Sequence, residues 1–234
     1  MTIRSRPLVL LDIDGTLLHS GGGGRRAFAR ALQTVFQWQD DLAWVNFSGA
    51  TDLEVLRQIC ERHGSWPDAE RVAQFFDELA RELDRALAAS PPRLLPGVKD
   101  LLDELEGVPG LILGLVTGNI STCADIKLRH AGLHGRFVLG AFGHEHAKRV
   151  EIARLALRRA EAHARGAALA PIVLIGDTPS DVAAARAIGA RAVAVATGAH
   201  DVAALRRAGA DVVVTTLCER DVLRPLWQAS GPVE

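Results

Sequence analysis

Short apolar runs alternate with helical patterns through most of this 234-residue chain, and this alternation constrains the fold more than any other feature. Each run has the length of a buried strand, and each pattern between two runs repeats with the period of a helix. Parallel strands need a crossover between them, which is usually a helix, so this order predicts an α/β fold with a doubly wound parallel sheet. The expected strands are 8–11, 111–116, 137–139, 172–175, 192–196 and 212–214, and the expected helices of this part are 98–105, 121–130, 151–164, 179–188 and 202–208.

Residues 18–94 break this rhythm, because they show helical patterns and no convincing strand. Three helices are expected there, at 25–37, 53–63 and 69–88, and Thr51-Asp52-Leu53-Glu54 has the pattern of a capping box that opens the second. We therefore expect a core domain made of 1–17 and 95–234, and a helical cap domain at 18–94, inserted after the first strand.

Two aspartates, Asp12 and Asp14, directly follow the first apolar run, and Gly15 ends it. A parallel strand delivers such residues to the carboxyl edge of the sheet, where open α/β folds bind their ligands. Like charges this close raise one another's pKa unless a cation lies between them, so the pair indicates a shared proton or a metal. A solvated turn after a strand also favours Asp and Gly, so the pair needs support from elsewhere.

Thr117-Gly118-Asn119 follows another expected strand and precedes the helix at 121–130. A hydroxyl group and free backbone amides at the start of a helix form an anion site, although this tripeptide is common in unrelated turns.

A third strand end carries Asp177, and Asp181 follows four residues later. Asp177 is therefore placed like Asp12. Asp181 also has a structural interpretation, because Thr178 as N-cap and Pro179 at the first helical position would start a helix.

Lys148 and Arg149 precede the helix expected at 151–164. Basic residues at this end oppose the helix dipole, which suggests that another group needs the positive charge, although a Lys-Arg pair is also ordinary on an exposed turn.

Taken in order, Asp-x-Asp-Gly-Thr, strand-Thr-Gly-Asn, a basic residue and Gly-Asp-x-x-x-Asp resemble the motifs of the haloacid dehalogenase (HAD) superfamily of phosphotransferases. The resemblance covers nearly the whole chain, and it is closest to the phosphoglycolate-phosphatase-like branch, which has a helical cap after the first strand. It implies a Rossmann-like core and a Mg²⁺-dependent phosphatase that acts on a small phosphorylated metabolite, a phosphomonoester.

The resemblance also implies roles for individual residues. Asp12 would be the nucleophile that forms an aspartyl-phosphate, and Asp14 would be the general acid and base. The implied metal ligands are Asp12, the backbone carbonyl of Asp14, Asp177 and Asp181, with Asp181 orienting a metal-bound water or the basic residue. The implied catalytic or phosphate-binding residues are Thr16, Thr117, Gly118, Asn119, and either Arg149 or Lys148.

The basic position departs from the family pattern, because no Pro follows the Lys-Arg pair. Spacing from Leu155 favours Arg149, and Lys148 is the alternative. Arg would bind phosphate through a bidentate fork and keep its charge.

A few residues distinguish the other activities that occur on the same fold. A dehalogenase lacks the second carboxylate, and a phosphonate hydrolase needs a lysine in the cap, whereas Lys99, Lys127 and Lys148 all lie outside it. A phosphomutase of the β-phosphoglucomutase type shares every core motif and remains the main alternative. A binding module that has lost catalysis is less consistent with the filled acidic positions.

Composition adds limits on partners and location. A net charge of -1 argues against nucleic acid as a partner. No apolar segment is long enough for a membrane span or a secretory signal, and three scattered cysteines indicate a reducing compartment. We therefore expect a cytoplasmic monomer or homodimer that does not bind membranes. His144 and His146 are interpreted as residues of a solvated loop, since no third ligand lies at a recognisable spacing.

Overall fold

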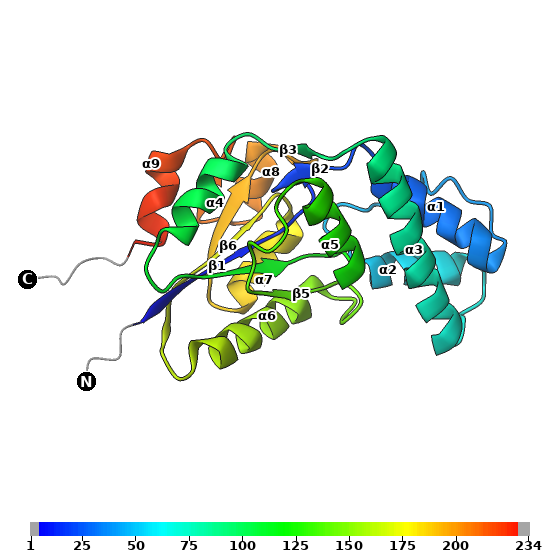
Figure 1. Ribbon diagram of the computed structural model, residues 1–234, viewed down its shortest axis with the longest axis horizontal. Coiled ribbons are helices and arrows are strands. Elements are labelled where there is room, and N and C mark those ends of the chain that lie inside the picture. The colour runs from blue at the N-terminus through cyan, green and yellow to red at the C-terminus, as the bar shows by residue number, and fades with distance from the viewer. Residues whose placement is uncertain (1–4, 229–234) are drawn as a thin grey trace, which may run out of the picture.

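A six-stranded parallel sheet forms the centre of the molecule in the computed structural model, which describes residues 5–228 (Figure 1). The strand order is β5-β4-β1-β6-β7-β8, and every neighbouring pair is parallel. The sheet confirms the doubly wound α/β fold expected from the alternating pattern. Its strands are β1 (Arg6–Leu11), β4 (Ile112–Val116), β5 (Leu139–Ala141), β6 (Leu169–Gly176), β7 (Arg191–Val195) and β8 (Val212–Val214).

Both faces of the sheet are covered by helices, which is why its strands are almost entirely apolar. Along β1, Val9 and Leu11 pack into the hydrophobic cluster on one face, and Leu8 and Leu10 pack into the cluster on the other. Side chains of α4, α5 and α9 belong to the first cluster, and side chains of α6, α7 and α8 belong to the second. The helix bounds are α4 (Val98–Glu106), α5 (Ser121–His130), α6 (Arg149–Ala164), α7 (Pro179–Ala187), α8 (Val202–Arg207) and α9 (Arg220–Leu223).

The strand order reverses at β1, which lies between β4 and β6. In open α/β sheets the crevice outside the carboxyl ends of the strands at such a point is the usual ligand site. Asp12, Thr117 and Asp177 directly follow β1, β4 and β6 respectively. The topology therefore brings three separate sequence motifs to one edge of the sheet.

Three further helices, α1 (Gly23–Phe36), α2 (Asp52–Arg62) and α3 (Ala69–Ala89), lie beyond this edge (Figure 1). They share a hydrophobic cluster whose centre includes Phe28 and Phe75, with ring centroids 5.0 Å apart. Ile120 and Ile126 at the α5 side of the core belong to the same cluster, as does Cys123. The three helices are therefore packed onto α5 as well as onto one another.

Side-chain caps start two of these helices. Thr51 accepts a hydrogen bond from the Glu54 amide at the start of α2, and Asp68 accepts one from the Arg71 amide at the start of α3. In contrast, the N-cap of α1 is Gly22, which has a φ of 77° and no side chain to cap the helix. The predicted helix at Thr51 is confirmed, but the Glu54 side chain bonds to Arg57 and Gln58 rather than closing a reciprocal capping box.

Two expectations for the strands were wrong. Residues 18–94 do carry strand residues, because β2 (Leu18–His19) and β3 (Arg93–Leu94) form an antiparallel pair where the chain leaves the core and returns. Strands of two residues are too short to show a period. The strand expected at 137–139 begins two residues later, as β5, because Leu139, Gly140 and Ala141 pair with Gly114, Leu115 and Val116 of β4.

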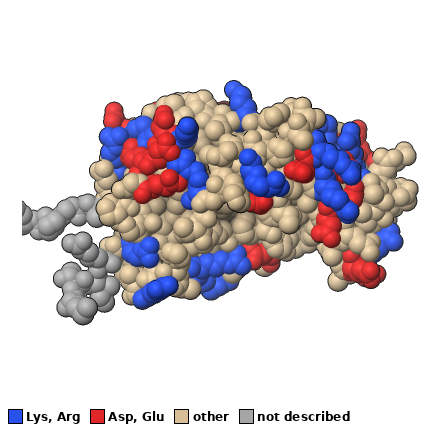
Figure 2. Space-filling view, in the orientation of Figure 1, with Lys and Arg blue, Asp and Glu red and all other residues tan. Residues whose placement is uncertain are grey.

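The surface carries mixed charge on the face shown in Figure 2, where groups of basic and acidic side chains lie side by side. Among the described residues, no helix is both long and apolar enough to cross a membrane.

Candidate active site

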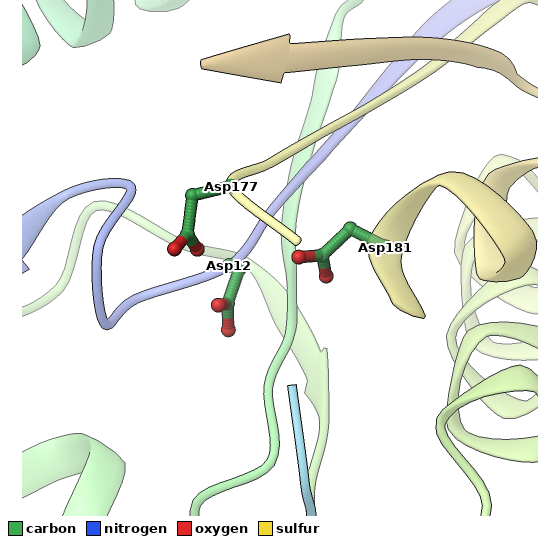
Figure 3. Close-up of side chains that lie close together, drawn as sticks. All are labelled: Asp12, Asp177 and Asp181. Carbon is green, nitrogen blue, oxygen red and sulfur yellow. The ribbon is translucent and has the colours of Figure 1, made fainter. Parts of the chain in front are cut away.

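Three buried carboxylates converge at the carboxyl edge of the sheet: Asp12 after β1, Asp177 after β6 and Asp181 in the first turn of α7 (Figure 3). One oxygen from each lies within 4.8 Å of the others. Two strand ends fix the first two side chains. The third is fixed by a capping box, in which Asp181 accepts hydrogen bonds from the amide and hydroxyl of Thr178 while the Thr178 hydroxyl accepts one from the Asp181 amide.

Arg149, at the start of α6, provides the counter-charge. Its Nη2 lies 2.6 Å from Oδ1 of Asp12, and its Nε lies 2.6 Å from Oδ1 of Asp181. Nη2 also donates to the carbonyl oxygen of Val116 at the end of β4. The guanidinium group is buried. Through these contacts it links the ends of β1 and β4 to the start of α7.

One cation does not balance the three carboxylates. Although Nε of Arg149 and Oδ1 of Asp181 are close, their geometry does not make a hydrogen bond, and both atoms are buried with no other partner among residues 5–228. Burial and the neighbouring carboxylates of Asp181 and Asp12 raise the pKa of Asp177 to about 8, and burial similarly raises the pKa of Asp12. The set of hard oxygen donors with excess negative charge fits a divalent cation such as Mg²⁺.

Thr117 presents a hydroxyl group beside this cluster. Its Oγ1 accepts hydrogen bonds from the backbone amide and the Nδ2 of Asn119, at 3.3 and 2.8 Å. Because both contacts use the oxygen as acceptor, the hydroxyl proton is free to be donated to an anion.

Asp14 is held apart from the three clustered carboxylates by a separate network. Its Oδ2 accepts from Nζ of Lys127 at 2.6 Å and from Nδ2 of Asn119 at 2.7 Å, and Lys127 also donates to Oδ1 of Asn119. Burial acts to raise the pKa of Asp14, but the Lys127 ammonium and the two hydrogen bonds outweigh it, so this pKa is lowered. The carboxylate is therefore ionised and fixed in orientation, while 42 % of the side chain is exposed.

A cavity of about 320 Å³ connects these groups to the three helices α1–α3. Its core end is lined by Asp12, Asp14, Thr117, Arg149 and Asp177, and its other end is lined by apolar side chains of these helices.

The start of α2 closes one side of the cavity against the core. The amide of Asp52 donates to the Gly118 carbonyl at 2.7 Å, and the Thr51 hydroxyl donates to the Ala147 carbonyl at 3.0 Å. A Cβ atom at Gly118 would lie 2.1 Å from the carbonyl oxygen of Ala50, so only glycine permits this approach. The Thr-Gly-Asn turn thus packs against the start of α2 and also lines the cavity.

The structure brings together most of the residues singled out from the sequence. Gly118 and Asn119 line the cavity with Thr117. Of the two basic candidates, Arg149 is buried against Asp12, whereas Lys148 is exposed as the N-cap of α6. Thr16 is fully buried and donates to Oδ1 of Asp177 at 3.3 Å, so it supports a carboxylate and does not line the cavity.

His144 and His146 are exposed and lie outside the acidic cluster, as their interpretation as loop residues requires.

Lys127 is the site residue that sequence reasoning missed. From the sequence it is placed only as a lysine outside the expected cap. A usable signal was present, because Lys127 lies one helical turn after the apolar Cys123, on the same face of a helix that directly follows Thr-Gly-Asn. Both residues line the cavity.

Comparisons with known proteins agree with this geometry. The family model of haloacid dehalogenase-like hydrolases matches residues 9–186, so the chain belongs to this family. The chain is 30% identical over 218 residues to the "probable phosphatase IndB" of Dickeya dadantii (strain 3937), and the match covers 92% of this chain and 91% of that protein.

Two solved structures show the same fold. One is CbbY from Rhodobacter sphaeroides in complex with phosphate, with a TM-score of 0.70, 22% identity, and coverage of 92% of this chain and 96% of that chain. The other is a predicted phosphoglycolate phosphatase from Haemophilus somnus 129pt, with a TM-score of 0.67, 22% identity, and coverage of 95% and 99%.

Proposed function

We propose that this protein is a phosphatase that hydrolyses a small phosphomonoester, with Mg²⁺ as cofactor and an aspartyl-phosphate intermediate on Asp12. The observation that carries the proposal is the arrangement at the core end of the cavity. There Asp12 lies beside a cation, Arg149, and a hydroxyl donor, Thr117, while a separately held carboxylate, Asp14, faces the same space. The relative from D. dadantii supports the same reaction class.

The first half of the reaction transfers the phosphoryl group to Asp12. A carboxylate oxygen of Asp12 forms a bond to phosphorus as the bond from phosphorus to the ester oxygen breaks, and the departing oxygen takes a proton from Asp14, which is ionised in the structure and first takes up that proton when the substrate binds. Arg149 has five N–H donors, which exceed its contacts with Asp12, Asp181 and Val116, so donors remain for a phosphate oxygen. Thr117 and the backbone around Gly118 hold the other oxygens.

The second half releases phosphate. Asp14 takes a proton from water as the water oxygen bonds to phosphorus, and the bond between phosphorus and Asp12 breaks. The ionised form of Asp14, which Lys127 and Asn119 stabilise in the structure, is the form that accepts this proton.

Asp12, the backbone carbonyl of Asp14, Asp177 and Asp181 are the residues proposed to hold Mg²⁺, with Asp181 acting directly or by orienting a bound water. When bound, the ion would supply positive charge that lets the carboxylate of Asp12 approach a phosphate dianion. The helices α1–α3 are proposed to form a cap domain that excludes water and selects the alcohol.

The test is release of phosphate from an aryl phosphate by the purified full-length chain, with and without Mg²⁺. We expect activity that requires the cation and falls by about 10⁴-fold or more in Asp12→Asn, because the nucleophile is lost. Asp100→Asn, at an exposed position on α4, is the matched control and should keep full activity. Wild-type activity that persists in excess chelator would contradict the proposal, and isomerisation of a sugar phosphate without phosphate release would indicate a mutase instead.

A further inference from the structure

The lining of the cavity becomes mainly apolar beyond Asp14, where the alcohol part of a phosphomonoester would lie. Helices α1, α2 and α3, together with the segment between α1 and α2, contribute the walls of this region. Its apolar lining residues are Phe28, Phe47, Val55, Leu79 and Leu83. Four of these five side chains, all but Phe47, are almost fully buried, so the region offers a dry, apolar surface to one face of a ligand.

The positively charged side chains that line the cavity are already engaged. The guanidinium of Arg25 donates to the carbonyl oxygens of Leu42 and Val45, and it lies over the ring of Phe47, 4.7 Å from the centroid. It therefore fixes the loop between α1 and α2.

The other two cations serve the catalytic carboxylates. Lys127 is bound to Asp14 and Asn119, and Arg149 is bound to Asp12 at the phosphate end. The one histidine in the lining, His19, has its Nε2 2.9 Å from the carbonyl oxygen of Thr197. Among the described residues of the lining, each cation therefore already contacts protein acceptors, and a second anionic group on the substrate would have to compete with them.

A carboxylate with an unused acceptor also lies beside this region. Asp52, at the start of α2, accepts a hydrogen bond from the Ile120 amide through Oδ2 at 2.7 Å. Within the described part of the chain its Oδ1 has no hydrogen-bond partner, so this oxygen can accept from a ligand. A substrate carboxylate or second phosphate would meet this anion in a largely desolvated space, whereas a hydroxyl or N–H group would find an acceptor.

We infer that the alcohol released by this enzyme is uncharged, presents an apolar face such as a ring, and carries a hydroxyl or N–H group that donates to Asp52. The inference rests on the proposed phosphatase function and narrows its substrate class. It excludes phosphoglycolate and sugar bisphosphates as preferred substrates of this chain.

The test compares benzyl phosphate, 4-(hydroxymethyl)benzyl phosphate and 4-carboxybenzyl phosphate. These esters share the same phosphate and nearly the same leaving oxygen, so differences in kcat/KM report the far end of the cavity. We expect the hydroxymethyl ester to be hydrolysed at least about tenfold more efficiently than the carboxy ester, a difference of about 1.4 kcal/mol, since burying a charge without a partner is costly. 2-Hydroxyethyl phosphate and phosphoglycolate form a second matched pair, with the same expected order.

The variant Asp52→Asn tests the residue itself. Asparagine can still accept a hydrogen bond from the Ile120 amide, but it carries no negative charge. The ratio of kcat/KM for the hydroxymethyl ester to kcat/KM for the carboxy ester should therefore decrease severalfold. Asp77→Asn makes the same change at an exposed position on α3 and should leave the ratio unchanged. A circular-dichroism melt of each variant checks its folding. The ratio of the kcat/KM values of the two esters, measured on the wild-type protein, tests the inference without any variant.

The outcomes separate the inference from the function on which it rests. Equal or faster hydrolysis of the carboxylate-bearing member in both pairs would overturn the inference and leave a phosphatase. No phosphate release from any ester in the presence of Mg²⁺ would overturn the proposed function, and the inference with it.

Discussion

The two ends of the cavity are built in different ways. At the core end, Asp12, Thr117 and Asp177 are positioned by the backbone, because each follows a strand of the same sheet. At the far end, positions depend on how the side chains of three amphipathic helices pack, as those of Phe28 and Leu83 do. The comparison indicates that the sheet topology determines the chemistry, whereas side-chain packing determines which alcohol fits.

After loss of the nucleophile itself, the largest effect should come from removing the cation at the core end. Arg149→Met leaves Asp12 and Asp181 without their counter-charge and removes donors from the phosphate, so kcat/KM should fall by about 10³-fold. Phosphate-release kinetics on benzyl phosphate measure the loss.

Two further variants keep this prediction interpretable. Lys148→Met alters the adjacent, exposed lysine and should change kcat/KM little. Because loss of one partner from a buried ion pair costs about 3–5 kcal/mol, Arg149→Lys, which keeps a charge, covers the case in which Arg149→Met does not fold. Equal losses at positions 148 and 149 would show that the core end is not organised as described.

An intermediate effect is expected at the boundary between the two ends, where Lys127 holds Asp14. In Lys127→Met the carboxylate of Asp14 loses its direct contact with the ammonium group, and Asn119, which also donates to Asp14, loses the hydrogen bond that Lys127 gives to its Oδ1. We expect kcat to fall by about 10²-fold with little change in KM, since Lys127 acts through Asp14 and two of its three donors are held by Asp14 and Asn119.

Steady-state kinetics of Lys127→Arg and Lys99→Met complete this test. Arginine should restore part of kcat if a cation beside Asp14 is what matters, and Lys99 is exposed on α4, so its loss should have no effect. A rise in KM at constant kcat would instead show that Lys127 binds the substrate. In that case it would not act as a residue that positions Asp14.

The smallest effect concerns pH at the far end. Burial raises the pKa of Asp52 to about 6, partly opposed by the Lys127 ammonium, and Asp14 and Cys123 are the other titratable groups around it. Asp52 is therefore ionised above this value and neutral below it. The preference for the hydroxymethyl over the carboxy ester should decrease by a few-fold from about pH 8 to about pH 5.5, because the repulsion is lost.

The ratio of the two kcat/KM values at each pH is the measurement, since effects common to both esters cancel. In Asp52→Asn the ratio should be independent of pH over this range. A ratio that increases on acidification would argue against Asp52 as the discriminating charge.

The same division explains what the sequence could predict. The order of apolar runs determines the sheet, so the fold was predicted and is confirmed. Strand ends also predicted the position of Asp177 beside Asp12. In contrast, β2 and β3 have two residues each, and the pairing of β5 depends on β4, so neither has a periodic signal of its own.

Residues that act through tertiary contacts could not be placed from their spacing. Lys127 is ordinary in a helical pattern, and it meets Asp14 only because α5 packs beside the end of β1. Thr16 belongs to the first motif, yet its side chain turns toward Asp177 rather than the cavity. The roles assigned to the site residues remain predictions that the kinetic tests address.

The apolar cluster that α1–α3 share with α5 limits how this protein could be recombined. Ile120, Cys123 and Ile126 are encoded outside residues 18–94 but pack inside the helical insertion. A chimera that exchanges only residues 18–94 with those of a relative would set a foreign surface against these three side chains. To change the substrate specificity by exchanging residues 18–94, the residues of α5 and its N-cap that pack against them would therefore have to be exchanged as well.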